Sequence, residues 1–569
     1  MNRLLPLPEA LSRFVKPGMH LCFASTPSRS NAAVRELSRQ FRGTSPEFTL
    51  SATGFHSLLH LLGLLRLGRR YIGCFFGDNY PVPRANGLYG TLLREGYTLE
   101  QWSLWSYVSA LAAGAYGHPF GFTRSLVGTT LGARLAEQDK LFEVADPVDP
   151  DRSLGLVRAI VPDITFLHAP LGDAHGNVAF SPPYGEGFYG ALAARQGAIV
   201  TVERIVSSDV LANLPHFRPL PAHRVLAVCE EPFGAHPQPL HIAPAELRAL
   251  ETGYADDYAG YQAWRTMSQE PEAFARFEEQ VLAARDGCAA YRSFASAAHL
   301  EALRRPASSL PPPPPLQAEQ LEPSDDLLLL AGRALARRVQ QGGYRAILAG
   351  IGQAFGACRL AKLLLGERGE DVELMVETGF SDIDVAGAHP FLLSRENVES
   401  AARLTAIDSV LGALCCGGSA ACIGVIGAAE VDVEGNVNST ESEGELLVGG
   451  GGAPDIAACA REVMVLSRAE PRRLLRKVAY VTSLGHNVRT IVTEACVFER
   501  AGNGEPWLVR DLVPSRASAL KELLHAGSFC FAMPGPPPVA SPPTAFELEL
   551  LARLRARGGQ KRKSEAKSG

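Results

Sequence analysis

One glutamate stands where chemistry can occur, at the end of an apolar run. Glu377 follows the segment Glu373–Val376, which has the pattern of a buried strand, and it precedes Thr378 and Gly379. Ligand sites of α/β proteins form at the carboxyl edge of the parallel sheet. A carboxylate that is positioned and desolvated at such an edge can act as a nucleophile. The spacing alone still favours an ordinary glutamate at a strand end.

A run of four glycines, Gly449 to Gly452, precedes Ala453 and a predicted helix that contains Asp455. Glycine lets the backbone approach a ligand closely. N–H groups at the mouth of a helix can point at an oxyanion or a phosphate. A flexible loop without a function is the alternative, but four glycines in a row cost folding entropy. We therefore predict a ligand-binding loop here.

Two further motifs give weaker signals. The segment from Gly350 to Gly356 follows a strand pattern and opens a helix, but its third glycine is one residue late for GxGxxG. This favours an ordinary tight turn over a dinucleotide site. Trp102, Trp105 and Tyr107 are expected in the core, with an aromatic wall of a substrate pocket as the alternative.

The spacing of metal ligands is not found in the sequence. The eleven cysteines contain no CxxC pair, and the HxxxH pair His56 and His60 has Ser57 where zinc proteases need a glutamate. We therefore expect no metal. Most cysteines stand in apolar runs, which is typical of buried free thiols in a reducing cytoplasm. No secretory signal follows the first residue, so we expect a cytoplasmic protein.

Charge and hydropathy exclude two kinds of partner. The 55 lysines and arginines against 60 aspartates and glutamates give a net charge of −5, which argues against binding of nucleic acid. The stretch between Asp408 and Glu430 has no charged residue and is about as long as a membrane span. Glycines interrupt it, so we interpret it as buried strands or a short helix joined by a turn, with no membrane association.

Alternating strand and helix patterns must position these residues. The strand patterns lie at residues 20–25, 163–170, 197–206, 344–352, 371–379, 478–484 and 490–500, and clear helix patterns lie at 31–41 and 356–366. Such alternation is typical of α/β proteins. We predict two open α/β domains with mainly parallel sheets.

A proline-rich segment divides the chain. The five prolines Pro311 to Pro315 favour an extended spacer and cannot continue a helix. The predicted parts are a first domain at 1–303, a linker at 304–326, a second domain at 327–555 and a basic disordered tail at 556–569. Both domains contain a DxxGNV motif, at residues 173–178 and 432–437, in which Gly-Asn is typical of a tight hairpin turn. The repetition suggests that the two domains are related.

The combined motifs of the second domain resemble family I CoA-transferases, in particular the glutaconate CoA-transferase type. Residues 376–379 look like the VESG segment of that family, whose glutamate is the nucleophile, and residues 449–453 look like its GSGGA loop. Residues 426–440 and 472–485 are similar to its GNVNST turn and its RRF…KIDYVTSPG stretch. The motifs occur in the order found in the family.

The first domain resembles the α subunit of the same family more loosely. Residues 77–83, 117–129 and 163–177 are similar to its GDxYPxP, GxPFxPTRSxxGTD and DxxxxHxxxxDxxGN patterns. The family commonly uses two separate subunits, whereas here they are fused. Thr378 replaces the serine of VESG, and Thr130 replaces the aspartate of GTD. Several organic acids are therefore compatible with these motifs as the source of the acyl group.

The resemblance implies a CoA-transferase in which Glu377 forms a glutamyl-CoA thioester during a ping-pong exchange between an acyl-CoA and a small carboxylic acid. Coenzyme A is then a substrate, and no permanently bound cofactor is expected. The implied oxyanion and CoA contacts are Gly449, Gly450, Gly451, Gly452 and Ala453, and the candidate pocket residues are Ser125, Trp102 and Gly379. An acyl-CoA hydrolase, hydratase or decarboxylase on the same scaffold, or a non-catalytic CoA-binding protein, is the alternative. A homodimer of the fused chain is a plausible assembly.

Overall fold

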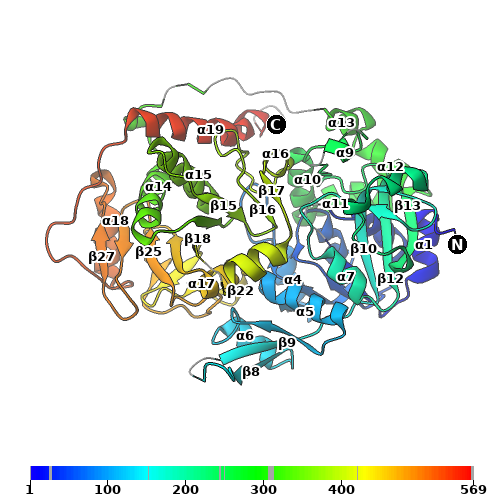
Figure 1. Cartoon of the computed structure of the whole chain (residues 1–569), viewed down its shortest axis with the longest axis horizontal. Coiled ribbons are helices and arrows are strands. Elements are labelled where there is room, and N and C mark those ends of the chain that lie inside the picture. Colours follow the sequence, from blue (N-terminus) through cyan, green and yellow to red (C-terminus); the bar gives the residue numbers. More distant parts are fainter. Residues whose placement is uncertain are drawn as a thin grey trace.

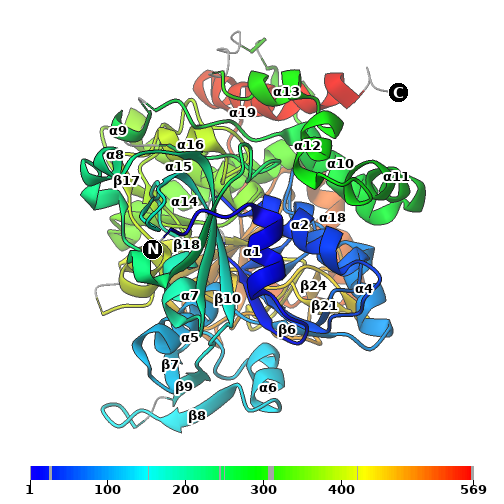
Figure 2. The ribbon, with the colours of Figure 1, turned by 90° about the vertical axis from the view of Figure 1, so that its right-hand side faces the viewer.

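The computed structural model shows two α/β halves packed side by side, with a small antiparallel sheet projecting from the first half (Figures 1 and 2). It describes residues 2–24, 28–150, 153–242, 245–248, 250–305, 313–314, 316–418 and 421–565. The projecting sheet has the order β7 (Phe120–Thr123), β9 (Ser153–Arg158), β8 (Leu141–Ala145). The prediction of an α/β fold with mainly parallel sheets is confirmed.

The first half is built on a parallel sheet. Its strand order is β13 (Val225–Glu230), β12 (Gly197–Ile205), β10 (Ile164–Gly172), β1 (His20–Phe23), β2 (Phe48–Ser51), β4 (Gly68–Gly73), β6 (Thr98–Gln101). All neighbours on this path pair in parallel. After β1 the chain proceeds to β2 on one side and later to β10 on the other. Such a reversal of strand order opens a crevice at the carboxyl ends of the strands.

Helices cover both faces of this sheet because alternate strand residues point to opposite faces. Phe166 and Ile199 lie in one buried cluster with residues of α1 (Leu7–Phe14) and α2 (Asn31–Phe41). Leu167 and Val200 lie in another cluster with Ala191 of α7 (Gly187–Ala193). The remaining helices of this half are α3 (His60–Leu64), α4 (Gly87–Arg94), α5 (Leu104–Tyr116), α6 (Thr130–Ala136), α8 (Ser208–Ala212), α9 (Ala245–Arg248), α10 (Tyr258–Gln269), α11 (Pro271–Phe277), α12 (Gly287–Phe294) and α13 (Ala297–Ala302). The helix α2 has the bounds predicted for it.

The second half has a ten-stranded mixed sheet with a parallel centre. Its order is β17 (Arg403–Leu404), β16 (Phe380–Ser381), β15 (Glu373–Val376), β14 (Ala346–Ala349), β18 (Cys422–Gly427), β23 (Glu462–Leu466), β25 (Val488–Val492), β26 (Val497–Glu499), β27 (Trp507–Arg510), β28 (Phe531–Ala532). The pairs from β15 to β25 are parallel, whereas β16, β17 and β26 pair antiparallel with their neighbours. Here too the strand order reverses at the first strand, β14.

The two halves share a core. On one face of the second sheet, Ile347 and Leu374 pack against the long helices α14 (Pro323–Gly342) and α15 (Gln353–Glu367). On the other face, Leu348 and Met375 belong to a cluster that includes residues of α17 (Ala453–Cys459) and of α5 from the first half. The first half therefore covers one face of the second sheet. The smaller helices here are α16 (Arg395–Glu399), α18 (Ala517–Ala526) and the π-helix η6 (Asp408–Cys415).

The repeated motif forms the same turn twice. The Asp173 carboxylate accepts the N–H of Asn177 at 2.9 Å, and the Asp432 carboxylate accepts the N–H of Asn436, also at 2.9 Å. The glycine before each asparagine has a positive φ, 88° at Gly176 and 84° at position 435. The turns lead into β11 (Val178–Ala179) and β20 (Val437–Asn438), which pair antiparallel with β10 and β19 (Glu430–Asp432). The predicted hairpin is thus confirmed in both halves.

Other sequence predictions have mixed outcomes. The stretch without charges forms η6 and β18, as expected; residues 419–420 lie outside the described part. Residues 478–484 were expected as a strand but form a loop. Their backbone pairs with β20 through one bridge, between Ser483 and Val437. No longer pairing forms there because β20 is only two residues long.

The predicted boundaries shift at both ends of the second domain. The helix α14 begins at Pro323, inside the predicted linker, whose residues 306–312 and 315 lie outside the described part. The helix α19 runs from Ala545 to Glu565, into the segment expected to be disordered, since Ala, Arg, Lys, Gln and Glu are all good helix formers.

Candidate active site

Glu377 stands in the turn between β15 and β16. The pairing of these strands leaves Glu377, Thr378 and Gly379 as the connecting loop. Gly379 has φ +102°, and a Cβ there would lie 2.7 Å from the backbone of Ala406. Its carbonyl also accepts the N–H of Thr405 at 2.6 Å. Gly379, predicted as a pocket residue, therefore holds the turn that presents Glu377 and is not among the residues that line the cavity described below.

The Glu377 carboxylate is desolvated. The residue is 7% exposed, and no described residue donates a hydrogen bond to its side chain. Burial raises the pKa of Glu377 from its ordinary 4.5 to about 7. Because hydration and hydrogen bonds are what weaken a carboxylate as a nucleophile, this environment favours attack on an electrophile.

The glycine loop lies directly against this carboxylate. A Cβ built on Gly452 would stand 2.0 Å from Oε2 of Glu377. The loop is anchored to the first half, because the Gly451 carbonyl accepts the N–H of Leu104 at 2.9 Å and the Val448 carbonyl accepts that of Phe76 at 2.7 Å. Glu377 is thus enclosed by a loop that both halves hold in place.

Only part of the loop is free to bind an oxyanion. Three of its N–H groups already donate to carbonyl oxygens at 3.0 Å, those of Gly449 to Ser439, Gly451 to Cys74 and Ala453 to Gly450. Within the described part of the chain, the N–H groups of Gly450 and Gly452 have no acceptor. Of the five residues predicted to bind an oxyanion, Gly449–Ala453, two therefore keep a free N–H donor, and Gly452 is the one in contact with Glu377.

A cavity opens at Glu377 between the two halves, and we call it the Glu377 cavity. Its volume is about 860 Å³ including the open space at its mouth. The first half contributes Thr53, Gly54, His56, Cys74, Phe75, Asn79, Leu104, Gln238, Pro239 and Tyr261, and the second half contributes Ile351, Glu377, Thr378, Phe391, Leu393, Ile407 and Gly451. Most of the first group follow strands β2 and β4, whereas Gln238 and Pro239 follow β13 and Tyr261 belongs to α10. The crevices of both sheets therefore face each other across this space.

His56 is the basic side chain of this wall that sequence reasoning set aside. Asn79 lies 3.5 Å from its Nε2 atom, and Phe75 packs edge-on against its ring. Burial, together with the nearby Arg29 and His60, lowers the pKa of His56 well below its ordinary value. The imidazole is therefore uncharged at neutral pH.

Ser125 and Trp102, predicted as pocket residues, are not among the residues that line the Glu377 cavity. The Ser125 hydroxyl donates to Oδ1 of Asp455 at 2.5 Å, and Ser103 donates to the same oxygen at 2.8 Å. Burial raises the pKa of Asp455 to about 8. Trp102 is fully buried in the shared core, with its Nε1 donating to Glu100 at 2.8 Å. Both residues lie at the junction of the halves. Apolar packing holds Trp102 there, and the hydrogen bond to Asp455 holds Ser125.

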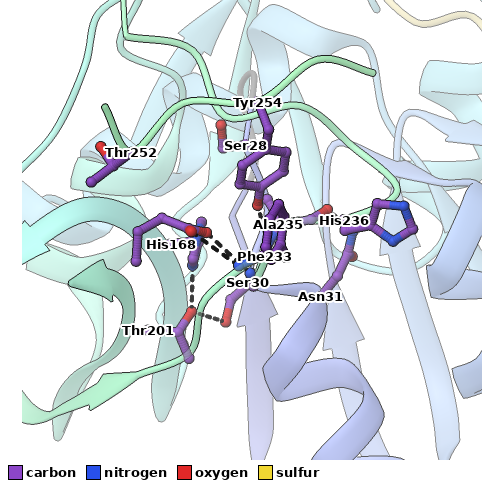
Figure 3. Close-up of polar contacts among 12 residues, drawn as sticks. Ser28, Ser30, Asn31, His168, Thr201, Phe233, Ala235, His236, Thr252 and Tyr254 are labelled. Carbon is purple, nitrogen blue, oxygen red and sulfur yellow. Dashed lines mark hydrogen bonds and ion pairs between the residues drawn. The ribbon is translucent and has the colours of Figure 1, made fainter. Parts of the chain in front are cut away.

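A second polar network supports the loop that carries Gln238 and Pro239. His168 of β10 contacts the Thr201 hydroxyl at 2.9 Å through Nδ1, and Thr201 contacts Ser30 at 2.7 Å (Figure 3). Nε2 of His168 lies 2.9 Å from Glu203, whose carboxylate also accepts the N–H of Phe233 at 3.0 Å. These side chains bond to one another and to the backbone of the same half, so we assign the network a structural role behind the cavity wall.

Among the described residues, the side chains of His236, Asp257 and His299 come close enough together to hold a metal ion. Asp257 already bonds both imidazoles, at 2.9 Å and 3.1 Å, and none of the three lines the Glu377 cavity. The possible metal ligands among the residues that line the cavity, His56, Cys74 and Glu377, do not form such a cluster. In the described part of the chain, no helix has the length and hydropathy to cross a membrane.

Comparison with known proteins agrees with this geometry. The family described as coenzyme A transferase matches residues 6–219 and 402–515, more than half of the chain. Subunits A and B of 3-oxoadipate CoA-transferase from Pseudomonas knackmussii are each 28% identical, over 50% and 39% of this chain and 94% and 91% of their own lengths. An acyl-CoA transferase from Escherichia coli O157:H7 has the same fold, with a TM-score of 0.64 at 17% identity over 95% of this chain and 94% of its own. This chain therefore belongs to the coenzyme A transferase family and is a transferase with both subunit-like halves in one polypeptide.

Proposed function

We propose that this enzyme moves coenzyme A from an acyl-CoA to a carboxylic acid through a glutamyl-CoA thioester on Glu377. The observation that carries the proposal is the buried carboxylate at the wall of the Glu377 cavity, without a hydrogen-bond donor and in contact with Gly452. A desolvated carboxylate is a stronger nucleophile than a hydrated one. Its location between the halves gives a substrate access to it.

The first half-reaction has two steps. An oxygen of Glu377 attacks the thioester carbonyl of the acyl-CoA, the C–S bond breaks, and CoA leaves as the thiolate. The product is a mixed anhydride between the acyl group and the side chain. The thiolate then attacks the glutamyl carbonyl of this anhydride, the donor leaves as a free carboxylate, and a glutamyl-CoA thioester remains on Glu377.

The second half-reaction runs the same steps in reverse with a different acid. The acceptor carboxylate attacks the glutamyl thioester and expels the CoA thiolate, which then attacks the acceptor carbonyl and frees Glu377. One thioester replaces another, so the exchange needs no input of energy. Binding of the remote parts of CoA can offset the cost of orienting and desolvating the reacting groups.

The N–H of Gly452 supports this mechanism as the oxyanion donor. Each step passes through a tetrahedral centre with a negative oxygen, and the free N–H next to Glu377 can stabilise it. In other enzymes the loss of one such donor costs about 100-fold to 1000-fold in rate. Water must also be excluded, because the anhydride hydrolyses, and the apolar wall of the cavity serves that purpose.

The test is to look for the thioester itself. The protein is incubated with a panel of acyl-CoAs, treated with borohydride and measured by intact mass spectrometry. Borohydride reduces a glutamyl thioester to the alcohol, so one side-chain oxygen is lost and two hydrogens are gained, at Glu377. Glu377→Ala and Glu377→Asp should show no such change, and the exposed Glu367→Ala should behave as the wild type.

Two outcomes would contradict the proposal. Full transfer by Glu377→Ala would remove this residue from the mechanism. Release of free CoA in the absence of any acceptor acid, with no trapped adduct, would instead indicate an acyl-CoA hydrolase on the same scaffold.

A further inference from the structure

The Glu377 cavity is lined almost entirely by uncharged groups. Among the described residues of its wall there is no lysine and no arginine, and Glu377 is the one carboxylate. The apolar side chains of the wall are Phe75, Leu104, Pro239, Ile351, Phe391, Leu393 and Ile407. An anionic group other than the reacting one would meet no counter-charge there.

The polar groups of the wall cannot replace a cation. Burial and the nearby Arg29 and His60 keep the pKa of His56 well below its ordinary value, so the imidazole is neutral. The Tyr261 hydroxyl is already bonded to Asp256 at 2.9 Å, and the Gln238 side chain accepts a hydrogen bond from Asn31 at 3.2 Å. What remains for a substrate is weak, neutral hydrogen bonding.

One buried cation, Arg29, bonds to the backbone of the wall without lining the cavity. Arg29 is 1% exposed, and its Nη2 donates to the carbonyl of Gly54 at 3.0 Å. Gly54 lines the cavity, whereas Arg29 does not.

The proposed reaction leaves room for one negative charge at a time. When Glu377 is a carboxylate, the incoming acyl-CoA carries a neutral thioester next to it. When the acceptor brings its carboxylate, Glu377 is a thioester and has lost its charge. A second carboxylate on the acyl group would stay ionised throughout the cycle, and burying an unpaired charge costs several kcal/mol.

We propose that the acids exchanged by this enzyme carry a single carboxylate joined to an uncharged, mainly apolar group, and that dicarboxylic acids are excluded. This inference rests on the proposed function, since it assumes that the acyl group reaches Glu377 through this cavity. The selecting features are the missing counter-charge and the apolar wall around Phe75, Phe391 and Leu393.

The experiment compares acyl-CoAs that differ only at their far end. Butyryl-CoA is paired with succinyl-CoA, hexanoyl-CoA with adipyl-CoA, and benzoyl-CoA with terephthaloyl-CoA, and the rate of formation of the glutamyl-CoA adduct is measured by mass spectrometry. For at least one pair we expect the monocarboxylic member to react about 100-fold faster or more, as an unpaired buried charge implies. Equal or faster reaction of every dicarboxylic member would overturn the inference and leave the proposed function standing. No adduct with any of the six would overturn the proposed function itself.

A placed cation gives an independent check. Leu393→Lys puts an ammonium in the wall, and Val148→Lys puts one on a side chain that is 91% exposed and outside the cavity. We expect the first variant to narrow the preference for the monocarboxylic member about tenfold, and the second to leave it unchanged. Thermal unfolding shows whether Leu393→Lys is folded. If it is not, the inference is tested by the wild-type rate ratios between the monocarboxylic and dicarboxylic members of each pair. A folded Leu393→Lys with the wild-type ratio would contradict the role of the missing counter-charge.

Discussion

The contact between Gly452 and Glu377 predicts what a single methyl group would do. In Gly452→Ala the new Cβ would stand 2.0 Å from Oε2 and 3.0 Å from Cδ of Glu377. Non-bonded carbon and oxygen atoms do not approach closer than about 3 Å, so the carboxylate must move by about 1 Å. A misplacement of that size can cost a reaction about 100-fold, because the attacking oxygen no longer meets the thioester carbonyl in line. The backbone of Gly452, with φ −87°, suits alanine, so the fold should tolerate the change.

The neighbouring Gly451 supplies a matched control, because its substitution should lower stability without moving Glu377. In Gly451→Ala no atom lies within 4 Å of the new Cβ, but the residue has φ +53°. An alanine there costs about 1–2 kcal/mol of stability and does not touch Glu377. We therefore expect Gly452→Ala to keep its melting temperature and lose adduct formation, and Gly451→Ala to lose stability and still form the adduct.

The assay is the rate of adduct formation on Glu377, followed beside thermal unfolding of each variant. If Gly452→Ala formed the adduct within a few-fold of the wild-type rate, the glycine loop would not define the position of the nucleophile. The same conclusion would follow if both glycine variants lost adduct formation only in proportion to their loss of stability.

Two predictions concern pH. Because burial raises the pKa of Glu377 to about 7, the rate of adduct formation should fall about tenfold per pH unit below 7, and a flat profile between pH 5 and 8 would show that Glu377 ionises as an ordinary glutamate. The pKa of Asp455 is raised from 3.8 to about 8, so the folded state holds this proton more tightly than the unfolded state, and the stability it gives is present below pH 4 and lost between pH 4 and 8. The melting temperature of the wild type should therefore fall relative to that of Asp455→Asn as pH rises through this window. A constant difference between the two melting temperatures would contradict the raised pKa of Asp455.

The sequence predicted the second half better than the first because its functional groups are tied to local structure. Glu377 was found from a strand end, and the glycine loop from four residues in a row. Each is a short segment whose position follows from the strand beside it. The repeated turns at Asp173 and Asp432 were predictable for the same reason, since Gly-Asn acts within a few residues.

The residues of the first half could not be placed in this way. Ser125 and Trp102 were assigned to the pocket, yet their positions are set by partners more than 300 residues away or by a core shared with the second half. His56 and Asn79 reach the cavity because two sheets face each other, and nothing in the local sequence reports that arrangement. The HxxxH spacing drew attention to His56 only as a metal ligand.

The position of the active site at the junction explains why both halves are needed. The nucleophile comes from the second sheet, but the loop that confines it is held by backbone bonds to Cys74, Phe76 and Leu104 of the first half. The carboxylate of Asp455, at the start of the helix after that loop, is satisfied by Ser103 and Ser125 across the same junction. Separation of the halves would therefore leave a buried acid without its donors and a glycine loop without its anchors. Fusion in one chain raises the effective concentration of each half for the other, and so keeps the geometry around Glu377 intact at low protein concentration.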